Sequence, residues 1–166
     1  MLTTDPLAIR RADWEKQFQI NLFGCYEVSR CVARHMIDQG IKGAIVSIAS
    51  EAGKKGHVDC LAYSASKAGV ISMTRMLSEA LAPHDINVNC VCPGAVATPM
   101  LRQIAEDYSK FMAEAPDVLF DKIRNVQLSR HVEPVEVARA VSLLLSDDAM
   151  LIRGQAVNID AGETPY

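Results

Sequence analysis

The 166-residue sequence has no long apolar run, and this absence excludes one class of protein at the outset. A helix that crosses a bilayer needs ~20 consecutive apolar residues, and no stretch here approaches that length. An excess of positive charge is also missing, since the net charge is -3 and the pI is near 5.8. Lysines and arginines are scattered without interleaved aromatic residues. We therefore expect neither a membrane protein nor a nucleic-acid-binding protein.

Paired cysteine motifs are absent as well. The five cysteines, Cys25, Cys31, Cys60, Cys90 and Cys92, include no CxxC pair and no histidine-bracketed metal spacing. They predict free thiols in a reducing compartment and no metal site. The opening "MLTTDPLAIRR" has neither the apolar core nor the small-residue cleavage site of a signal peptide, so a cytoplasmic location is expected.

The first half of the chain alternates helical and strand-like patterns. A helical stripe, with Asp13 as its N-cap and Gly40 as its stop, consists of Trp14, Phe18, Leu22, Cys25, Val28, Val32 and Met36. Residues 44–50 ("AIVSIAS") predict a strand buried on both faces, and residues 61–82 predict a helix that ends before Pro83. A second strand follows at residues 86–91 ("INVNCV"). Strand, helix and strand in this order indicate a right-handed crossover in a parallel sheet.

The second half continues the same α/β pattern. Residues 100–115 and 117–128 predict two helices, and a third helix has Pro134 in its first turn. The closing "GQAVNID" predicts a third strand. The sequence contains no repeat, low-complexity segment or long linker, so we expect one domain over residues 1–166. Three strands are few for a doubly wound α/β domain, which usually has five or more.

The segment "AYSASKAG" contains the most suggestive pair of side chains. Tyr63 and Lys67 are four residues apart, so in a helix they share one face. An ammonium near a phenol favours the phenolate, which predicts a lowered pKa for Tyr63 and a role as general acid or base. Four tyrosines and seven lysines in this sequence give about 0.2 such pairs by chance, so the pair alone is weak evidence.

Other candidates gain weight only from their positions. Ser50 ends the first expected strand, where it could face a ligand or cap a turn. Asn21 interrupts the apolar stripe, where it needs hydrogen-bond partners or marks a helix kink. In "CPGAVATPM", Pro93 and Gly94 force a turn and Thr98 offers a hydroxyl, which suits either a polar ligand or an ordinary loop.

Taken together, "QINLFG", "IVSIASEAG", "YSASK" and "INVNCVCPGAVATPM" resemble, in order and spacing, the short-chain dehydrogenase/reductase family. The closing "GQAVNIDAGE" is similar to the family's last strand, and the resemblance runs from Asp13 to Gly162. It implies the C-terminal part of a Rossmann-like, doubly wound parallel sheet in three layers (α/β/α). It also implies an NAD- or NADP-dependent oxidoreductase that interconverts a secondary alcohol and a ketone, and a homo-oligomer, dimer or tetramer.

The resemblance also implies roles for individual residues. Tyr63 is the expected acid/base, Lys67 lowers its pKa and binds the nicotinamide ribose, Ser50 binds the substrate oxygen, and Asn21 holds a relay water. The cofactor contacts extend to the turn formed by Pro93, Gly94, Val96 and Thr98. Residues 99–128 match the variable substrate lid, although a helix pair that merely packs is equally compatible.

The sequence departs from the family at its amino-terminal side. The family's first strand, its glycine-rich phosphate turn and its Asn-Ala-Gly strand end have no counterpart, and no GxGxxG occurs here. The chain is therefore expected to begin about halfway through the family's sheet, and binding of a dinucleotide by this chain alone is in question. The alternative is an inactive fragment that acts as an oligomerising module. A hydrolase with a serine and lysine pair is disfavoured, because no second motif provides an oxyanion hole.

Overall fold

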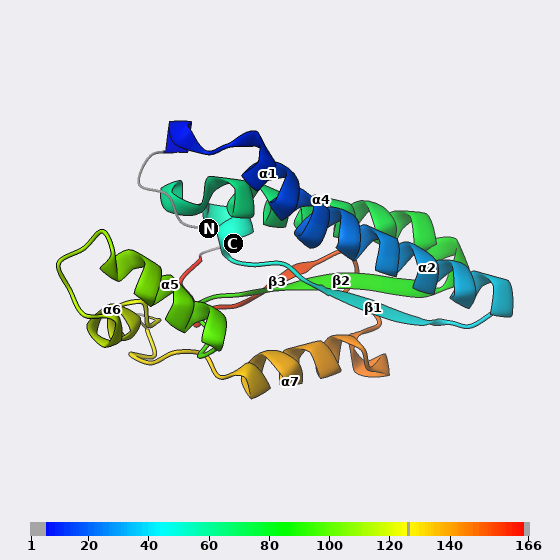
Figure 1. The fold of residues 1–166 in the computed structure, drawn as a ribbon. Coiled ribbons are helices and arrows are strands. Elements are labelled where there is room, and N and C mark those ends of the chain that lie inside the picture. Colours follow the sequence, from blue (N-terminus) through cyan, green and yellow to red (C-terminus); the bar gives the residue numbers. More distant parts are fainter. Residues whose placement is uncertain (1–5, 126, 165–166) are drawn as a thin grey trace.

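The computed structural model describes residues 6–125 and 127–164, and expectations for Met1 to Asp5 lie outside them. Three parallel strands form one sheet in the order β1-β2-β3, with β1 at Gly43–Ile48, β2 at Ile86–Pro93 and β3 at Ala156–Ile159 (Figure 1). All three expected strands are confirmed. The central strand β2 is buried from Ile86 to Cys92, because it has neighbours on both sides and helices on both faces.

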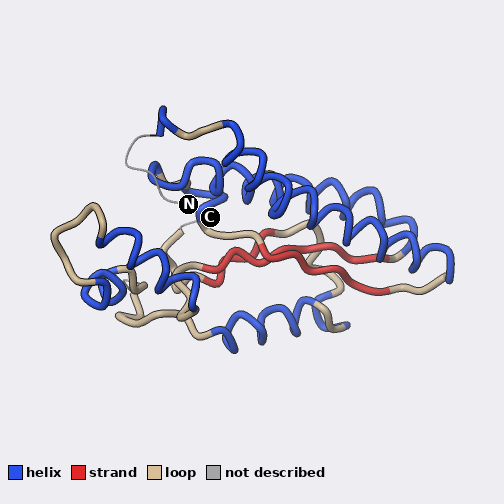
Figure 2. Tube along the Cα trace, viewed as in Figure 1, coloured by secondary structure: helices blue, strands red, loops and turns tan. Residues whose placement is uncertain are grey.

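Helices cover both faces of this sheet, which gives the three-layer α/β fold expected from the sequence. On one face lies a continuous helical run made of α1 (Arg11–Phe18), the π-helical η2 (Gln19–Phe23) and α2 (Gly24–Gln39). Beside it lies α4 (Leu61–Leu81), and α7 (Pro134–Leu144) covers the opposite face (Figures 1 and 2). Gly40 ends α2 with a φ of 63°, the left-handed conformation that glycine adopts easily.

The π-helical turn changes which side of the long helix is buried. A π turn adds one residue to the helical repeat, so the apolar stripe after it is rotated relative to the stripe before it. Ser29 and Ala33 are the buried residues of α2, whereas Val28 and Val32 are exposed. The expected stripe was therefore wrong at these two valines. The expected N-cap was also wrong, because the helix begins at Arg11 and places Asp13 in its first turn.

The remaining helices lie at the carboxyl end of the strands or in connections. They are α5 (Pro99–Ser109) and α6 (Pro116–Lys122), with the short elements η1 (Pro6–Ala8), α3 (Ala52–Lys55), η3 (Val58–Cys60), η4 (Ala82–His84) and η5 (Asp147–Ala149). Both helices of the lid segment are shorter than expected. The extended Ala115 precedes Pro116, and a residue before proline disfavours helical backbone. Within the described residues, no helix is long and apolar enough to cross a bilayer.

Two buried amides on β2 hold the chain that leads into β3. Asn87 Nδ2 donates to the carbonyl of Ala149 at 3.2 Å, and Asn89 Nδ2 donates to the carbonyl of Ile152 at 2.6 Å. The Asn89 side-chain oxygen accepts the backbone N–H of Gln155 at 2.9 Å. These bonds satisfy buried polar groups and fix the approach of the third strand.

Strand β1 differs from the strand expected from the sequence. It was expected to be buried on both faces, but of its residues only Ser47 is buried and Ile48 is 48% exposed. The reason is its position, since β1 has β2 on one side and forms one edge of the described sheet. An edge strand keeps one row of backbone groups free for pairing.

Candidate functional site

The candidate site lies where the carboxyl ends of β1 and β2 meet the first turns of α4. The loop after β1 is bonded to the end of β2, because the Glu51 N–H donates to the Pro93 carbonyl at 3.1 Å. This bond brings Ser50 to the same edge of the sheet as Gly94. Helix α4 begins at Leu61 and carries Tyr63 past this point. The carboxyl edge of a parallel sheet is where such folds collect ligand-binding groups.

Ser50 and Tyr63 meet at this edge. Ser50 is buried, and its hydroxyl accepts the Ala52 N–H at 3.2 Å, so it caps the turn that follows β1. Burial raises the pKa of Tyr63 above its ordinary value, and the nearby Ser50 side chain only partly opposes this effect. The phenol is therefore protonated at neutral pH and is able to donate.

Lys67 does not lower the pKa of Tyr63 here, contrary to the sequence-based expectation. Its ammonium nitrogen lies 5.8 Å from the centroid of the Tyr63 ring. The same nitrogen donates to the backbone carbonyl of Ile48 at 2.8 Å, at the end of β1. Burial lowers the pKa of Lys67 itself, since desolvation disfavours the charged form. The two residues share one face of α4, as expected, but the ammonium is directed to the strand.

Asn21 has the partners that a half-buried amide needs. It lies in the π-helical η2, and its Nδ2 donates to the Gln17 side-chain oxygen at 2.9 Å and to the Ser66 hydroxyl at 3.0 Å. Ser66 in turn donates to the backbone carbonyl of Tyr63 at 2.7 Å. This chain of bonds connects the helical irregularity to the first turn of α4. Asn21 is therefore a bonded amide within a π-helical turn.

The small residues of the segment "AYSASKAG", residues 62–69, permit close packing, as the sequence indicated. A Cβ atom on Gly69 would lie 2.9 Å from a methyl carbon of Leu22 in η2. A Cβ atom on Gly53 in α3 would lie 2.7 Å from the backbone carbon of Lys67. Contacts this short do not occur between real Cβ atoms and backbone, so glycine is required at residue 53 for α3 to pack on α4.

The turn after β2 is held from two sides. The Gly94 N–H donates to the Ile159 carbonyl at 3.2 Å, and a Cβ atom on Gly94 would lie 2.9 Å from Asp160. Val96 forms a parallel bridge with Val132. The Thr98 hydroxyl accepts the Leu101 N–H at 3.3 Å and thereby caps α5. Pro93, Gly94, Val96 and Thr98 are thus brought together beside the carboxyl end of β2, with the Thr98 hydroxyl engaged in capping.

The segment expected to form a lid, residues 99–128, is attached to the loop that enters α4. Tyr108 on α5 donates a hydrogen bond from its phenol to the Asp59 carboxylate in η3. Asp59 lies one turn before Tyr63 in the sequence. A separate hollow of about 420 Å³ lies at the base of the lid and is lined by Leu128, Val132, Glu136, Asn158, Ile159, Asp160, Ala161, Gly162 and Thr164. Neither Tyr63 nor Lys67 lines it, so we place the candidate chemistry at the phenol and not in this hollow.

An ion cluster beside Ser50 was missed by the sequence analysis. Glu51 is 9% exposed, and its carboxylate lies 3.0 Å from His57 Nε2 and 3.0 Å from the Lys55 ammonium. Lys55 also pairs with Glu163 at 2.7 Å. The hydrogen bond to Glu51 raises the pKa of His57. Burial raises the pKa of Glu51, but the bonds to His57 and Lys55 lower it more strongly, so the pKa of Glu51 lies below its ordinary value. Glu51 and His57 lie on either side of the short helix α3 and the turn after it, so no single helical or strand pattern could have revealed the pair.

The five cysteines are all free, as the sequence predicted. Cys90 and Cys92 lie on one face of β2 in the core beneath α4, together with the half-buried Cys25. Over residues 6–125 and 127–164, no group of three or more His, Cys, Asp or Glu side chains is arranged to hold a metal ion.

Comparisons with known proteins identify the family of this chain. A family model described as enoyl-(acyl carrier protein) reductase matches residues 2–164. The 3-oxoacyl-(acyl-carrier-protein) reductase FabG of Thermotoga maritima is 36% identical over 163 residues, 97% of this chain and 62% of the relative. The chain thus spans about 60% of the length of the curated relatives it matches.

Solved structures give the same picture. A variant of actinorhodin polyketide ketoreductase, solved with NADPH, superposes with a TM-score of 0.91 at 37% identity, covering 98% of this chain and 63% of that one. Xylitol dehydrogenase bound to NAD⁺ superposes with a TM-score of 0.86 at 30% identity, covering 94% and 62%. The chain therefore has the fold of the part of a Rossmann-like domain on which it superposes, and it belongs to the short-chain dehydrogenase/reductase family.

Proposed function

We propose that this chain carries the reacting side chains of an NAD- or NADP-dependent oxidoreductase that interconverts a ketone and a secondary alcohol. The observation that carries this proposal is the proximity of a half-buried, protonated phenol at Tyr63 to the buried Ser50 hydroxyl at the carboxyl edge of the sheet. Both groups are hydrogen-bond donors available to one substrate oxygen. Donors aimed at an oxygen that develops negative charge stabilise the transition state of carbonyl reduction.

Each residue has a stated task in this proposal. In the reducing direction, Tyr63 donates its phenolic proton to the substrate oxygen, and Ser50 holds that oxygen by a hydrogen bond. In the oxidising direction, the phenolate accepts the proton. Asn21, through Ser66, holds the backbone of Tyr63 in place and lies on the proposed proton path. Lys67 would stabilise the phenolate once its ammonium leaves the Ile48 carbonyl.

The residues present fit one end of the proposed cofactor. When bound, a nicotinamide dinucleotide supplies or accepts the hydride. Tyr63, Lys67 and the turn of Pro93, Gly94, Val96 and Thr98 would hold its nicotinamide end, because they lie at the carboxyl edge of the parallel sheet, where such folds bind their ligands. The pyrophosphate end has no glycine-rich turn among the described residues. The proposal therefore assigns only the nicotinamide end of the cofactor to the described residues.

The substrate is proposed to be a ketone next to an acyl thioester. Two of the similar proteins carry names that specify acyl-carrier or polyketide ketones, which supports this class. Residues 99–128 would close over the substrate as a lid, anchored by the bond between Tyr108 and Asp59; Val126 lies outside the described residues. We also propose one partial domain over residues 1–166 and a cytoplasmic location, which five free cysteines support.

The test is the substitution Tyr63→Phe, compared with Tyr26→Phe as a matched control. Tyr26 is 40% exposed on α2, so the control removes the same hydroxyl away from the site. Acetoacetyl-coenzyme A serves as the ketone substrate, and the oxidation of NADPH or NADH is followed by absorbance. We expect Tyr63→Phe to lower turnover about 100-fold or more with unchanged circular dichroism, because general acid catalysis is lost. Turnover equal to that of Tyr26→Phe would refute the assignment.

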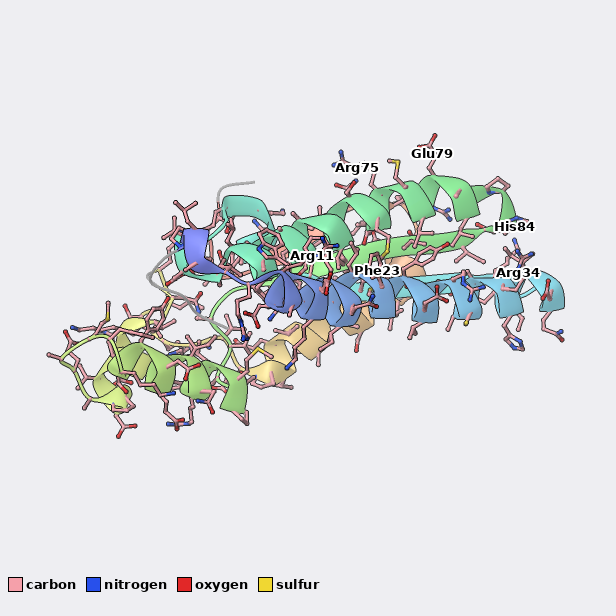
Figure 3. The ribbon with its side chains drawn as sticks, turned by 45° about the horizontal axis from the view of Figure 1, so that its top comes forward. Arg11, Phe23, Arg34, Arg75, Glu79 and His84 are labelled. Atoms are coloured by element: carbon pink, nitrogen blue, oxygen red, sulfur yellow. The ribbon has the colours of Figure 1, made fainter. Side chains whose placement is uncertain are left out.

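A second candidate, a module that associates without catalysis, is favoured by one specific observation. Helix α4 lies beside the helical run of η2 and α2 (Figure 3), and these helices expose apolar side chains that a monomer leaves in water. These are Phe23, Tyr26, Val28, Val32 and Met76. We propose that this surface forms a homo-oligomer, a dimer or tetramer. Light scattering after size-exclusion chromatography tests it, and a monodisperse monomer at every concentration would contradict it.

A further inference from the structure

The turn after Ser50 contains an ion cluster that the proposed reaction does not use. The backbone N–H of Glu51, the next residue, donates to the Pro93 carbonyl at 3.1 Å. The backbone carbonyl of Glu51 accepts the N–H groups of Lys54 at 2.9 Å and Lys55 at 3.1 Å. Glu51 therefore joins the end of β2 to the four-residue helix α3. A helix this short is not stable by itself, so side-chain contacts must fix the turn.

The Glu51 carboxylate contacts two cationic side chains, each through a different oxygen atom. Oε1 lies 3.0 Å from His57 Nε2, and Oε2 lies 3.0 Å from the Lys55 ammonium. The Glu51 side chain is only 12% exposed, and a charged group with so little access to water needs such partners. Lys55 ends α3 and His57 follows it, so the carboxylate closes the turn that begins at Ser50.

His57 extends this connection to helix α4. Its backbone N–H donates to the Ser64 hydroxyl at 3.2 Å, in the first turn of the helix. Ser64 is buried and directly follows Tyr63 in the chain. A path of covalent bonds and two polar contacts therefore leads from Ser50 to Tyr63, the two residues that the proposed function assigns to one substrate oxygen. The intermediate members of this path are Glu51, His57 and Ser64.

The charges of the cluster balance only when His57 is protonated. Lys55 also binds the Glu163 carboxylate at 2.7 Å, so two carboxylates face one ammonium and one imidazole. A protonated His57 gives Glu51 a charge-assisted hydrogen bond, which is stronger than the bond to a neutral imidazole. Deprotonation therefore weakens the path at its central contact. The other titratable groups around the cluster are Asp59 and Cys60 near η3, Tyr63 in α4, and Tyr108 in α5, which donates to Asp59.

We propose that Glu51 and His57 are positioning residues that fix the Ser50 and Tyr63 hydroxyls relative to each other, and that protonation of His57 strengthens this arrangement. The pair acts through the backbones of its neighbours and does not touch the substrate. The positioning is a property of this fold, whereas its effect on turnover rests on the proposed function. The cluster thus makes the geometry of the site depend on pH.

The first test measures the positioning without any turnover. Hydrogen exchange of the Glu51 and His57 amides, which donate to the Pro93 carbonyl and the Ser64 hydroxyl, is measured by NMR from about pH 5 to about pH 8. The rates are corrected for the intrinsic effect of pH, and the pKa of His57 is taken from its ring signals. We expect both amides to lose protection about tenfold as the pH rises through that pKa. Constant protection of both amides would overturn the proposal.

Two variants and one control test whether the pair itself is responsible. The His57 side chain is 39% exposed, and His57→Gln keeps a hydrogen-bond donor that does not titrate, so protection of the Glu51 amide should no longer depend on pH. Glu51→Gln keeps the shape of the side chain without its charge, and the pKa of His57 should fall because burial and the Lys55 ammonium both lower it. Glu15→Gln is the matched control, because Glu15 pairs with Arg11 at 2.8 Å on the exposed side of α1.

The control should retain the pH dependence of the unaltered protein. A pH dependence that persists in His57→Gln, or one that is lost equally in Glu15→Gln, would overturn the role of the pair. Circular dichroism of each variant verifies that it folds, and the mild His57→Gln change keeps the proposal testable if Glu51→Gln does not fold.

The second test measures turnover with NADPH and acetoacetyl-coenzyme A at saturating concentrations. We expect kcat to be about tenfold lower above the pKa of His57 than below it, with little change in KM, because misplaced groups slow the chemical step. This step in the pH profile should be absent in His57→Gln and present in Glu15→Gln. A change in the fold alone would not link the pH profile to the titration of one histidine.

The outcomes separate the positioning from the proposed function. Amide exchange that follows the pKa of His57, without any NADPH oxidation, would refute the proposed function and keep the positioning. NADPH oxidation with the same pH profile in the unaltered protein and in His57→Gln would refute the positioning and keep the proposed function.

Discussion

Replacing Gly53 with alanine should destabilise the protein, although alanine is usually the better residue in a helix. Gly53 lies in α3, and an added Cβ atom would meet the Lys67 backbone carbon at 2.7 Å and the Ala68 nitrogen at 2.8 Å. Both atoms belong to the α4 backbone, so no side chain can rotate away. Ordinary contacts of a Cβ atom begin at 3.4 Å, and α3 must therefore move by about 0.7 Å relative to α4.

The magnitude follows from two opposing effects. Overpacking of this kind costs about 1–3 kcal/mol, while alanine in a helix recovers about 1 kcal/mol relative to glycine. For a cost in the middle of that range, the free energy of unfolding should therefore fall by about 1 kcal/mol. For a domain of this size, 1 kcal/mol corresponds to about 2–4 °C in melting temperature, so Gly53→Ala should melt about 2–4 °C lower.

Gly24→Ala is the matched control, with the opposite expected sign. Gly24 has helical backbone angles of -59° and -43°, and an added Cβ atom would meet only the Gln19 carbonyl at 3.4 Å. This variant should gain about 0.4–1 kcal/mol. Circular dichroism during thermal and urea unfolding of both variants provides the measurement. A melting temperature of Gly53→Ala at or above that of the unaltered protein would refute the close packing of α3 on α4.

Two further predictions concern pH and helix capping. The bond to Glu51 raises the pKa of His57 above 6.5, so the stabilisation from this pair is fully present below about pH 6.5 and is lost as the pH rises through the pKa of the folded state. His57→Gln should abolish this decline in the free energy of unfolding measured with urea. A decline that persists in the variant would contradict the pairing. Thr98→Ala should cost about 1 kcal/mol in the same assay by removing the cap of α5, while Thr98→Ser retains it; equal losses in the two variants would argue against capping.

Much of the fold could be predicted because its signals are local. Short β-branched runs identify the three strands, and Pro134 and Gly40 mark a helix start and a helix end by their backbone restrictions. The exposure of Val28 and Val32 could not be predicted, because a single π-helical turn upstream rotates the buried face without a sequence signal of its own.

The sequence could predict which residues come together at the site, but not how their pKa values are shifted. Spacing places Tyr63 and Lys67 on one face of α4, but spacing carries no information about burial. Burial raises the pKa of Tyr63, and the open edge of β1 attracts the Lys67 ammonium away from the phenol. The pairing of Tyr108 with Asp59 also escapes sequence analysis, because 49 residues separate the two side chains along the chain.

The two buried asparagines of β2 have a consequence for how the protein tolerates sequence change. Apart from a bond between their own side chains, Asn87 and Asn89 bond to backbone groups of the segment between α7 and β3, and these groups are the same whatever side chains that segment carries. Leu151, at 99% exposure, can therefore vary freely during evolution or engineering. The two asparagines on β2 thus position this segment. In a library of variants, substitutions at Asn87 and Asn89 should be poorly tolerated, whereas substitutions at exposed loop positions should be tolerated.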